Sequence, residues 1–392
     1  MYPFIQEMRI LDLTRLFPGG YATQLLGDLG ARVLKVEDPW RGDYLRWEEP
    51  CFPGTNESVL FWGLNRNKKS IKLNLKSAAG KRILFKLLEQ YDIVLEGFRP
   101  GVMDKLGIGY EQLKAVNPAV ILCSISGFGQ DGPCYLTPGH DINYMAIAGA
   151  LGLSGTAGGA PVTPAVQVAD IGGGGMMAVI AVLAAYIHRQ TTGKGQYIDI
   201  SMLDGVVSWM SMLFLQAEVP SAGLKRGETR LGGGEICYNV YQTKDGGYMA
   251  LGALEPQFWL KFCQLAGRED WITEQFSRNG AVKAEVEILF KTRTRDEWAA
   301  CFAGADVCCE PVLDLSEVKA HPQVSGRKLF KRLDYDPAGV TEVVRNPIRF
   351  PTEPELEDLR PPGFGEHSQE VLRELGLSEE EILILLHEQT VV

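Results

Sequence analysis

The sequence predicts an α/β protein in which a large, Rossmann-like, doubly wound domain is accompanied by a smaller α+β domain. Three observations support this prediction. In the N-terminal part, short apolar strand-like runs alternate with helical segments, a pattern typical of parallel sheets. The length of 392 residues exceeds what a single hydrophobic core usually serves. Beyond residue 236 a hairpin pattern replaces the alternation.

The first β-α-β unit is the clearest element of the large domain. Residues 8–13 and 32–37 are strand-like, and residues 22–29 between them are predicted to form a helix. Pro18-Gly19-Gly20 is expected to separate the first strand from this helix, and Gly30-Ala31 is expected to end it. Such a unit is the seed of a parallel sheet.

The alternation continues along the chain. Strands are predicted at 70–75, 92–96 and 120–126, and helices at 78–90, 110–116, 176–190 and 201–217. Ligands on doubly wound sheets bind beyond the carboxyl ends of the strands. Arg99 and the turn at 127–133 follow two of these strands, so both are expected near a ligand. The Gly-x-Gly-x-x-Gly fingerprint is absent after the first strand, and no P-loop is present, which counts against NAD binding and ATP cleavage.

The remaining elements define the domain organisation. The large domain is assigned to 1–200, a linker helix and glycine-rich loop to 201–235, the small α+β domain to 236–320, and a segment that returns to the large domain to 321–392. In the C-terminal half we expect a hairpin of strands 237–242 and 248–251, helices near 257–266, 281–291 and 295–303, an extended segment at 343–350 and an amphipathic helix at 378–388.

Composition and charge count against several classes of protein. A net charge of −10 argues against a general nucleic-acid binder. The eight cysteines show no Cys-x-x-Cys or Cys/His metal spacing, so we expect reduced thiols in a cytoplasmic protein and no metal site. The N-terminus lacks the basic start of a signal peptide, and the longest apolar stretch, 176–187, is short for a membrane span, so no membrane association is expected.

Two titratable residues lie thirty residues apart in a glycine-rich stretch at 139–175. His140 follows a Pro138-Gly139 turn; its residue type suits acid/base catalysis near neutral pH, although a structural histidine would give the same sequence. Asp170 precedes Gly172 to Gly175 and an apolar helical segment. At this position an aspartate can cap the helix, act as an acid/base group, or do both. Free N–H groups at this helix start, approached closely across glycines, predict an oxyanion site.

For the other candidate residues, the sequence pattern alone leaves both a structural and a functional role open. Glu255 stands between a predicted strand and a predicted helix, where a first-turn acid that complements the helix dipole and a functional carboxylate are both compatible. Between Arg41 and Lys105 there are twelve Lys/Arg against eight Asp/Glu. This segment indicates either an ordinary solvated surface or a site for an anionic ligand.

Several motifs, in a fixed order, carry a resemblance to a known family. They are Leu26-Gly27-Asp28-Leu29-Gly30-Ala31, Asn65-Arg66-Asn67-Lys68-Lys69-Ser70, Glu96-Gly97-Phe98-Arg99-Pro100-Gly101, Ser126-Gly127-Phe128-Gly129-Gln130-Asp131-Gly132-Pro133 and Gly193-Lys194-Gly195-Gln196. Over nearly its whole length the chain resembles the family III CoA-transferase superfamily of the CaiB/BaiF type, which includes the 2-methylacyl-CoA racemases.

Within the superfamily, Gly-His-Asp-Ile-Asn-Tyr at 139–144 and Gly-Ala-x-Glu-Pro-Gln-Phe at 252–258 resemble the racemase branch. The resemblance implies an acyl-CoA epimerase that inverts the α-carbon of a 2-substituted acyl-CoA by two-base proton transfer through an enolate. His140 and Asp170 would be the two bases, and Glu255 would assist the histidine. No cofactor is implied beyond the CoA moiety of the substrate.

The alternative is a CoA-transferase that moves CoA between carboxylic acids through a covalent intermediate on Asp170. Phe17, at a position where formyl-CoA-type transferases have a glutamine, counts against that type of transferase. Two features count the other way. Gly232-Gly233-Gly234-Glu235 is similar to the glycine loop of the transferases, and Thr14-Arg15-Leu16-Phe17 differs from the small-residue run of the racemases. A CoA-binding paralogue without turnover is the third possibility.

The resemblance also implies the partners of the chain. We expect an acyl-CoA thioester as substrate and an interlocked homodimer in which Glu255 reaches the active site of the other subunit. Arginine and lysine suit the phosphates of CoA, and Arg46 belongs to the same basic segment. The residues assigned to CoA binding are Arg41, Lys69, Arg99, Met103, Lys105, Asp141 and Tyr144.

Overall fold

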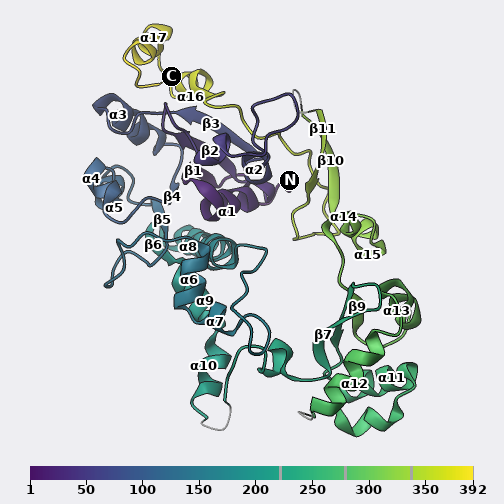
Figure 1. The fold of residues 1–392 in the computed structure, drawn as a ribbon. Helices are drawn as coiled ribbons and strands as arrows, with labels where there is room; N and C mark the ends of the chain where they lie inside the picture. The colour runs from purple at the N-terminus through teal and green to yellow at the C-terminus, as the bar shows by residue number, and fades with distance from the viewer. Residues whose placement is uncertain (220–222, 278–279, 336–338, 392) are drawn as a thin grey trace. The chain divides into compact units, whose positions relative to one another are not determined.

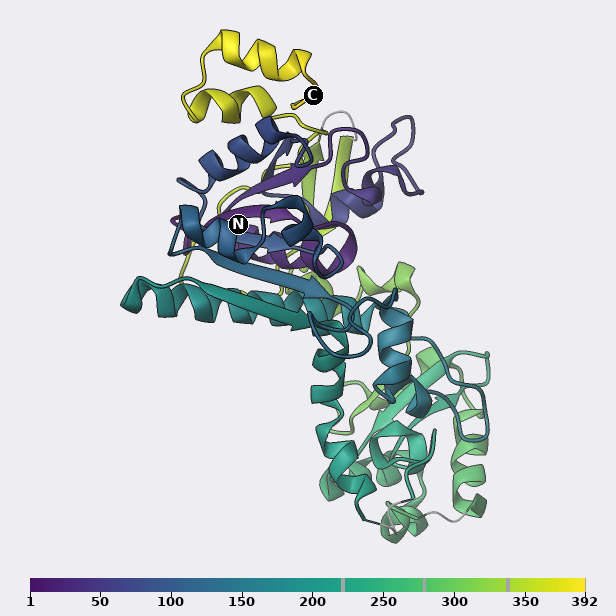
Figure 2. The same ribbon diagram turned by 90° about the vertical axis from the view of Figure 1, so that its left-hand side faces the viewer.

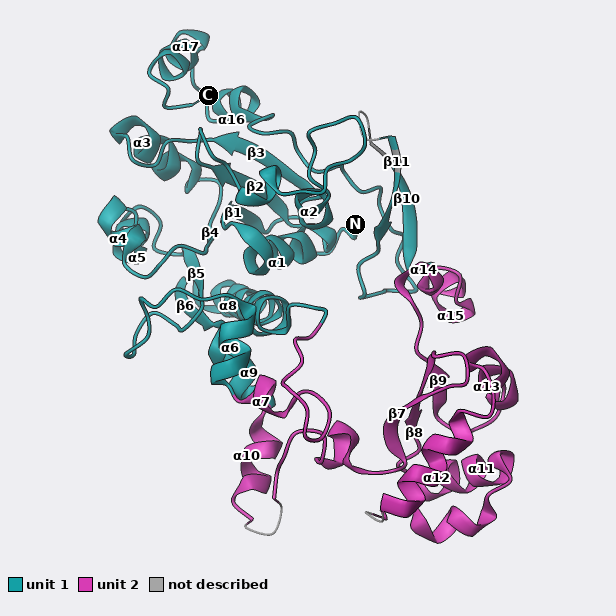
Figure 3. Cartoon of the chain, viewed as in Figure 1, with its two compact units in different colours: residues 1–148, 165–209, 328–392 teal, residues 149–164, 210–327 magenta. Residues whose placement is uncertain are grey.

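The computed structural model describes residues 1–219, 223–277, 280–335 and 339–391 (Figure 1). The chain divides into two compact units (Figure 3). Unit 1 comprises residues 1–148, 165–209 and 328–392, and unit 2 comprises residues 149–164 and 210–327. Unit 2 is therefore inserted into the sequence of unit 1.

A six-stranded parallel sheet with the order β3-β2-β1-β4-β5-β6 forms the centre of unit 1. This is the strand order of doubly wound dinucleotide-binding folds, and it confirms the predicted α/β class with a parallel sheet. The strands are β1 (Arg9–Leu13), β2 (Arg32–Glu37), β3 (Lys68–Lys72), β4 (Ile93–Glu96), β5 (Ile121–Ser126) and β6 (Gln196–Ser201).

Helices connect these strands and cover the sheet. They are α1 (Leu16–Asp28), α2 (Val59–Leu64), α3 (Ala78–Leu87), α4 (Val102–Leu106), α5 (Tyr110–Val116), α6 (Asp141–Ile147), the π-helix η2 (Val168–Met176), α8 (Met177–Thr192) and α9 (Met202–Trp209), with a short 3₁₀ turn η1 (Tyr44–Trp47). In Figure 2 the long teal helix α8 runs beside β5 and β6.

The last part of the chain completes the core of unit 1. Two helices, α16 (Ser368–Glu374) and α17 (Glu379–His387), bring Leu372 and Leu385 into the same buried cluster as Leu34. A hairpin of β10 (Phe330–Tyr335) and β11 (Gly339–Val344) precedes them.

The start of α1 differs from the prediction. The helix begins at Leu16 rather than at residue 22, so Pro18-Gly19-Gly20 lies within its first turns and does not form a separate break. Proline is well suited to the first turn of a helix, where its missing N–H is not needed. Gly19 is required by crowding, because a Cβ atom there would lie 2.2 Å from Cβ of Thr14.

The helix after the glycine run also differs from the prediction. It begins at Val168 rather than at Met176, so Gly172 to Gly175 lie inside a continuous helix. These glycines allow close helix packing: a Cβ atom on Gly173 would lie 2.7 Å from the carbonyl oxygen of Met202. The free N–H groups at the helix start belong to residues before the run, so the glycines themselves do not form the predicted oxyanion site.

The joined helix from Val168 to Thr192 has 25 residues, which makes it longer than the apolar stretch recognised in the sequence. By length and composition alone it would be able to cross a membrane. In the structure it packs against α1, α9 and the sheet, as the core helix of a globular unit does.

Unit 2 contains a three-stranded antiparallel sheet of β7 (Tyr238–Gln242), β8 (Tyr248–Gly252) and β9 (Cys309–Pro311). The hairpin β7–β8 was expected, whereas β9 has too few residues for a sequence pattern. The helices are α7 (Ala150–Leu153), α10 (Ser211–Ala217), α11 (Pro256–Ala266), α12 (Gly280–Phe290), α13 (Arg295–Phe302), α14 (Leu315–Val318) and α15 (Pro322–Gly326), with η4 (Arg230–Gly234) and η5 (Glu269–Glu274). Buried aromatic side chains, Trp259, Phe262, Phe290 and Trp298 among them, form its core.

Candidate active site

A cavity of about 630 Å³ opens in unit 1 beyond the carboxyl ends of β1, β4 and β5. This is the edge of a parallel α/β sheet at which ligands bind. We call it the His140–Asp170 cavity, because both side chains line it. The ends of these strands and the residues that follow them contribute Thr14, Arg15, Leu16, Gly97, Phe98, Arg99, Pro100, Ser126 and Gly127 to its wall.

Asp170 lies in the first turn of η2, and Asp141 holds it there. The Oδ1 atom of Asp141 accepts hydrogen bonds from the backbone N–H groups of Ala169, at 2.6 Å, and Asp170, at 3.0 Å. Asp141 thus satisfies two of the free N–H groups at the start of the helix. The side chain of Asp170 is left to face the cavity.

The pKa of Asp170 is raised to about 6. Burial of the carboxyl is the largest cause and the negative charge of Asp141 is the second, while the charge of His140 acts in the opposite direction. A carboxyl with this pKa holds a proton about as strongly as an imidazole ordinarily does. It is therefore suited both to accept and to return a proton near neutral pH.

His140 precedes α6, and its own backbone fixes its position. Its N–H donates to Oδ1 of Asn143 at 3.0 Å, which satisfies a backbone group at the helix start. The imidazole is exposed and lines the cavity. Among the described residues no hydrogen bond joins His140 to Asp170, and both side chains line the same cavity.

Tyr144 packs the turn that carries His140. Its hydroxyl donates to the carbonyl oxygen of Gly139 at 2.6 Å, and a Cβ atom on Gly139 would lie 2.8 Å from the Tyr144 ring. Burial, followed by the charges of Asp170 and Asp141, raises the pKa of Tyr144 to about 12, so the hydroxyl stays a donor at neutral pH. The hydroxyl of Tyr144 thus contacts the backbone before His140, and the carboxylate of Asp141 contacts the backbone at the start of η2. Their assignment to CoA binding stays a prediction.

Three side chains of the cavity wall were not singled out from the sequence. Arg15, Tyr44 and Ser126 all line it, and the Oγ atom of Ser126 is buried without a hydrogen-bond partner among the residues that the structure describes. A signal for two of them was present, since Arg15 and Ser126 come at the ends of predicted strands. Tyr44 lies in a turn that carries no such pattern.

Some of the basic side chains assigned to CoA binding are accessible, and another already forms ion pairs within the chain. Arg99 is exposed and lines the cavity, and it also borders a smaller one of about 130 Å³ together with Met103. Arg41 and Lys105 are exposed. Lys69 is already paired, since its Nζ lies 2.8 Å from Glu370 and 3.2 Å from Glu374.

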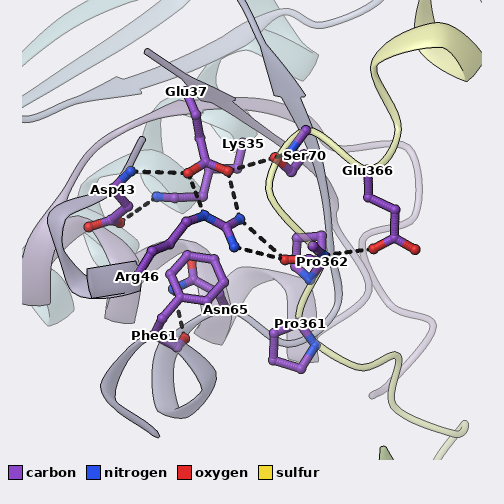
Figure 4. A network of polar contacts seen from close by, with 12 residues as sticks. Lys35, Glu37, Asp43, Arg46, Phe61, Asn65, Ser70, Pro361, Pro362 and Glu366 are labelled. Atoms are coloured by element: carbon purple, nitrogen blue, oxygen red, sulfur yellow. Dashed lines mark hydrogen bonds and ion pairs between the residues drawn. The ribbon is translucent and has the colours of Figure 1, made fainter. Parts of the chain in front are cut away.

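Arg46 has a structural role instead of the phosphate contact considered above. It is 6% exposed, and its Nε and Nη2 atoms donate to the Glu37 carboxylate at 2.8 and 2.7 Å (Figure 4). The guanidinium also donates to the carbonyl oxygen of Pro362 at 3.2 Å and stacks on Phe61. With these partners it joins the C-terminal segment to the sheet.

Glu255 lies in unit 2 at the residue before α11, with its side chain exposed. Its predicted action on the histidine stays a prediction. The glycine-rich segment η4 lines a cavity of about 900 Å³ in the same unit, together with Tyr238, Asn239, Lys283 and Cys308. Within the described ranges no group of three or more His, Cys, Asp or Glu side chains is arranged to hold a metal ion.

Known proteins resemble this chain over most of its length. Residues 5–368 match CoA-transferase family III. Alpha-methylacyl-CoA racemase from Homo sapiens is 35% identical over 384 residues, which cover 96% of this chain and 95% of the racemase. Succinyl-CoA:glutarate CoA-transferase from Homo sapiens is 32% identical over 379 residues, which cover 95% of this chain and 86% of the transferase. A solved CAIB/BAIF family protein from Brucella suis has a TM-score of 0.81 at 30% identity, covering 94% of this chain and 98% of that one.

Proposed function

Given that the chain belongs to CoA-transferase family III, we propose that it is an acyl-CoA racemase or epimerase that inverts the α-carbon of a 2-substituted acyl-CoA. The observation that carries this proposal is the placement of His140 and Asp170 in one cavity, with the pKa of Asp170 raised to about 6. The likeness to a racemase over 96% of the chain supports it.

The reaction moves one proton on each face of the substrate. The Asp170 carboxylate removes the α-proton of the thioester, and the electron pair of that C–H bond moves into an enolate. The imidazolium of His140 then delivers a proton to the opposite face. Asp170 is left protonated and His140 neutral, and exchange with water restores both. In the reverse direction the two groups exchange roles.

The enolate oxygen requires a donor, because its negative charge develops during the reaction. Ser126 is suited to donate this hydrogen bond, because the residue lines the cavity and its Oγ atom is shielded from water. Its hydroxyl has no other hydrogen-bond partner in the part of the chain that the structure describes. Arg99 would hold a CoA phosphate, so that binding energy from a remote part of the substrate positions the thioester.

The test is incubation with a single enantiomer of a 2-methylacyl-CoA in D₂O, without any free carboxylic acid. Deuterium at the α-carbon and loss of optical purity, measured by NMR and chiral chromatography, are the expected results. His140→Ala should lose inversion, whereas His188→Ala, which removes an exposed histidine of α8, should retain it. Retained inversion in His140→Ala would contradict the proposal.

A second candidate function is CoA transfer through Asp170 as a nucleophile, and the similarity to a CoA-transferase at 32% identity favours it. This function requires a free carboxylic acid as acceptor. Hydroxylamine added after incubation with acyl-CoA would then trap an adduct on Asp170, detectable by mass spectrometry. Transfer that depends on an acceptor, with no exchange at the α-carbon, would replace the first proposal by this one.

A further inference from the structure

Arg15 is a cation of the His140–Asp170 cavity that the proton transfer does not use. It is half-buried and lines the cavity. Its Nη1 donates to the hydroxyl of Tyr44 at 2.9 Å, and its guanidinium carbon lies 5.1 Å from the Tyr44 ring and 5.5 Å from the Phe98 ring. Among the described residues no carboxylate pairs with it. The two rings orient the guanidinium, and most of its five N–H donors remain available to a ligand.

Buried charges fix the backbone on both sides of Arg15. The Nζ atom of Lys35 donates to the carbonyl oxygen of Thr14 at 3.0 Å and lies 2.9 Å from Asp43 (Figure 4). Oδ1 of Asp43 in turn accepts the N–H of Leu16 at 3.1 Å. Both partners of this Lys35–Asp43 pair have side chains that are 0% exposed. The guanidinium is therefore held on a rigid loop, as a binding group that must be ordered before its ligand arrives.

The first turn of α1 follows Arg15 and borders the same cavity. Its Leu16 N–H is already accepted by Asp43, and Leu16, Pro18 and Gly19 line the cavity. This turn packs on the helix that carries Asp170, since a Cβ atom on Gly175 would lie 2.9 Å from the carbonyl oxygen of Pro18. Arg15 thus lines the same cavity as His140 and Asp170, where the proposed function places the reacting acyl group.

We propose that Arg15 binds a second carboxylate on the acyl group, so that the preferred substrates are CoA thioesters of 2-substituted dicarboxylic acids. The planar guanidinium matches a carboxylate with two parallel hydrogen bonds. This inference rests on the proposed function, because the function places the acyl group beside His140 and Asp170. A CoA phosphate is the other group that a guanidinium recognises, and the experiment separates the two.

The experiment compares two thioesters of equal chain length, 2-methylglutaryl-CoA and 2-methylpentanoyl-CoA, which differ in the terminal carboxylate. The measured quantity is the ratio of their kcat/KM values for α-proton exchange. The wild-type ratio should favour the carboxylated thioester, and Arg15→Gln should lower the ratio about 10- to 100-fold, as expected for loss of a charged hydrogen bond. Arg15→Lys should retain part of the preference. Arg32→Gln, the same change in an exposed arginine at the amino end of β2, should leave the ratio as in wild type.

A ratio unchanged in Arg15→Gln, with weaker binding of free CoA, would overturn the inference and assign Arg15 to a CoA phosphate. Dissociation constants of the two thioesters, measured by calorimetry, test the role of Arg15 even if no variant catalyses exchange. Weaker binding confined to the carboxylated thioester would support the inference while the racemase proposal fails. Equal weakening of both would overturn it.

Discussion

The Oδ1 atom of Asp141 accepts the backbone N–H of Asp170 at 3.0 Å, so two carboxyl groups that lie 29 residues apart in the sequence stand side by side at one helix start. One is buried and satisfied by backbone donors, and the other faces the cavity. Asp141 therefore acts on Asp170 in two ways, as an anchor for its backbone and as a negative charge that contributes to its raised pKa.

Asp141→Asn separates these two effects. The amide oxygen can still accept the two N–H groups, but the negative charge is lost, so the pKa of Asp170 should fall from about 6 toward its ordinary value. The acid limb of the pH profile of α-proton exchange should move to lower pH by up to about one unit. Asn143→Ala removes the acceptor of the His140 N–H without removing a charge, so it is the control for a disturbed turn and should leave the position of the limb unchanged. A limb that moves to higher pH would contradict this view of the site.

Asp170→Asn should abolish exchange and stabilise the fold. Because burial raises the pKa of Asp170 from 3.8 to about 6, the folded state binds this proton more tightly than the unfolded state does. The cost of ionisation is absent below about pH 4, grows as the pH rises toward 6, and is complete above it, where it amounts to about 1 to 3 kcal/mol. Urea denaturation at pH 8 should show the variant to be more stable, and the difference should vanish near pH 4. A gain that is equal at both pH values would have another cause.

Gly173→Ala should destabilise unit 1. Its Cβ atom would lie 2.7 Å from the backbone oxygen of Met202, and a backbone atom cannot rotate away as a side chain can. We expect a loss of about 1 to 3 kcal/mol in the free energy of unfolding. Gly63→Ala is the matched control, since no heavy atom lies within 4 Å of the added carbon in α2, and alanine should stabilise that helix by about 0.5 to 1 kcal/mol. Similar losses in both variants would argue against the packing role of the glycine run.

Lys35→Met tests the buried charges beneath Arg15. The substitution leaves Asp43 buried without the cation 2.9 Å away, which should cost about 3 to 5 kcal/mol. Lys69→Met breaks ion pairs of similar length, but Lys69 is 37% exposed, so its loss should cost less than about 1 kcal/mol. Denaturant melts of the two variants give both numbers. A cost for Lys35→Met as small as that for Lys69→Met would show that the loop does not depend on the pair.

Some elements follow from residue type and the breaks beside them. Residues 32–37, which follow Gly30-Ala31, form a strand with the predicted bounds, and Tyr110–Val116 form a helix with the predicted bounds. His140 and Asp170, which the structure brings to one cavity, could be selected from the sequence because each lies beside glycines in the same stretch of the chain.

The errors have a common physical origin in contacts between distant residues. Local propensity places a break at Gly172 to Gly175, but tertiary packing against Met202 and Trp209 makes the same glycines the interior of a helix. Arg46 reads as a surface cation until Glu37 and Pro362 are brought to it. Arg15 reads as a deviation from a motif until the rings of Tyr44 and Phe98 surround it.

The interrupted sequence of unit 1 has a consequence for biosynthesis. Leu372 and Leu385 belong to the core beneath the sheet, and the amino terminus of Met1 pairs with Asp358 at 2.6 Å. The ribosome therefore finishes the whole of unit 2 before it delivers the residues that close the core of unit 1. During that interval the nascent sheet exposes apolar surface to which chaperones can bind.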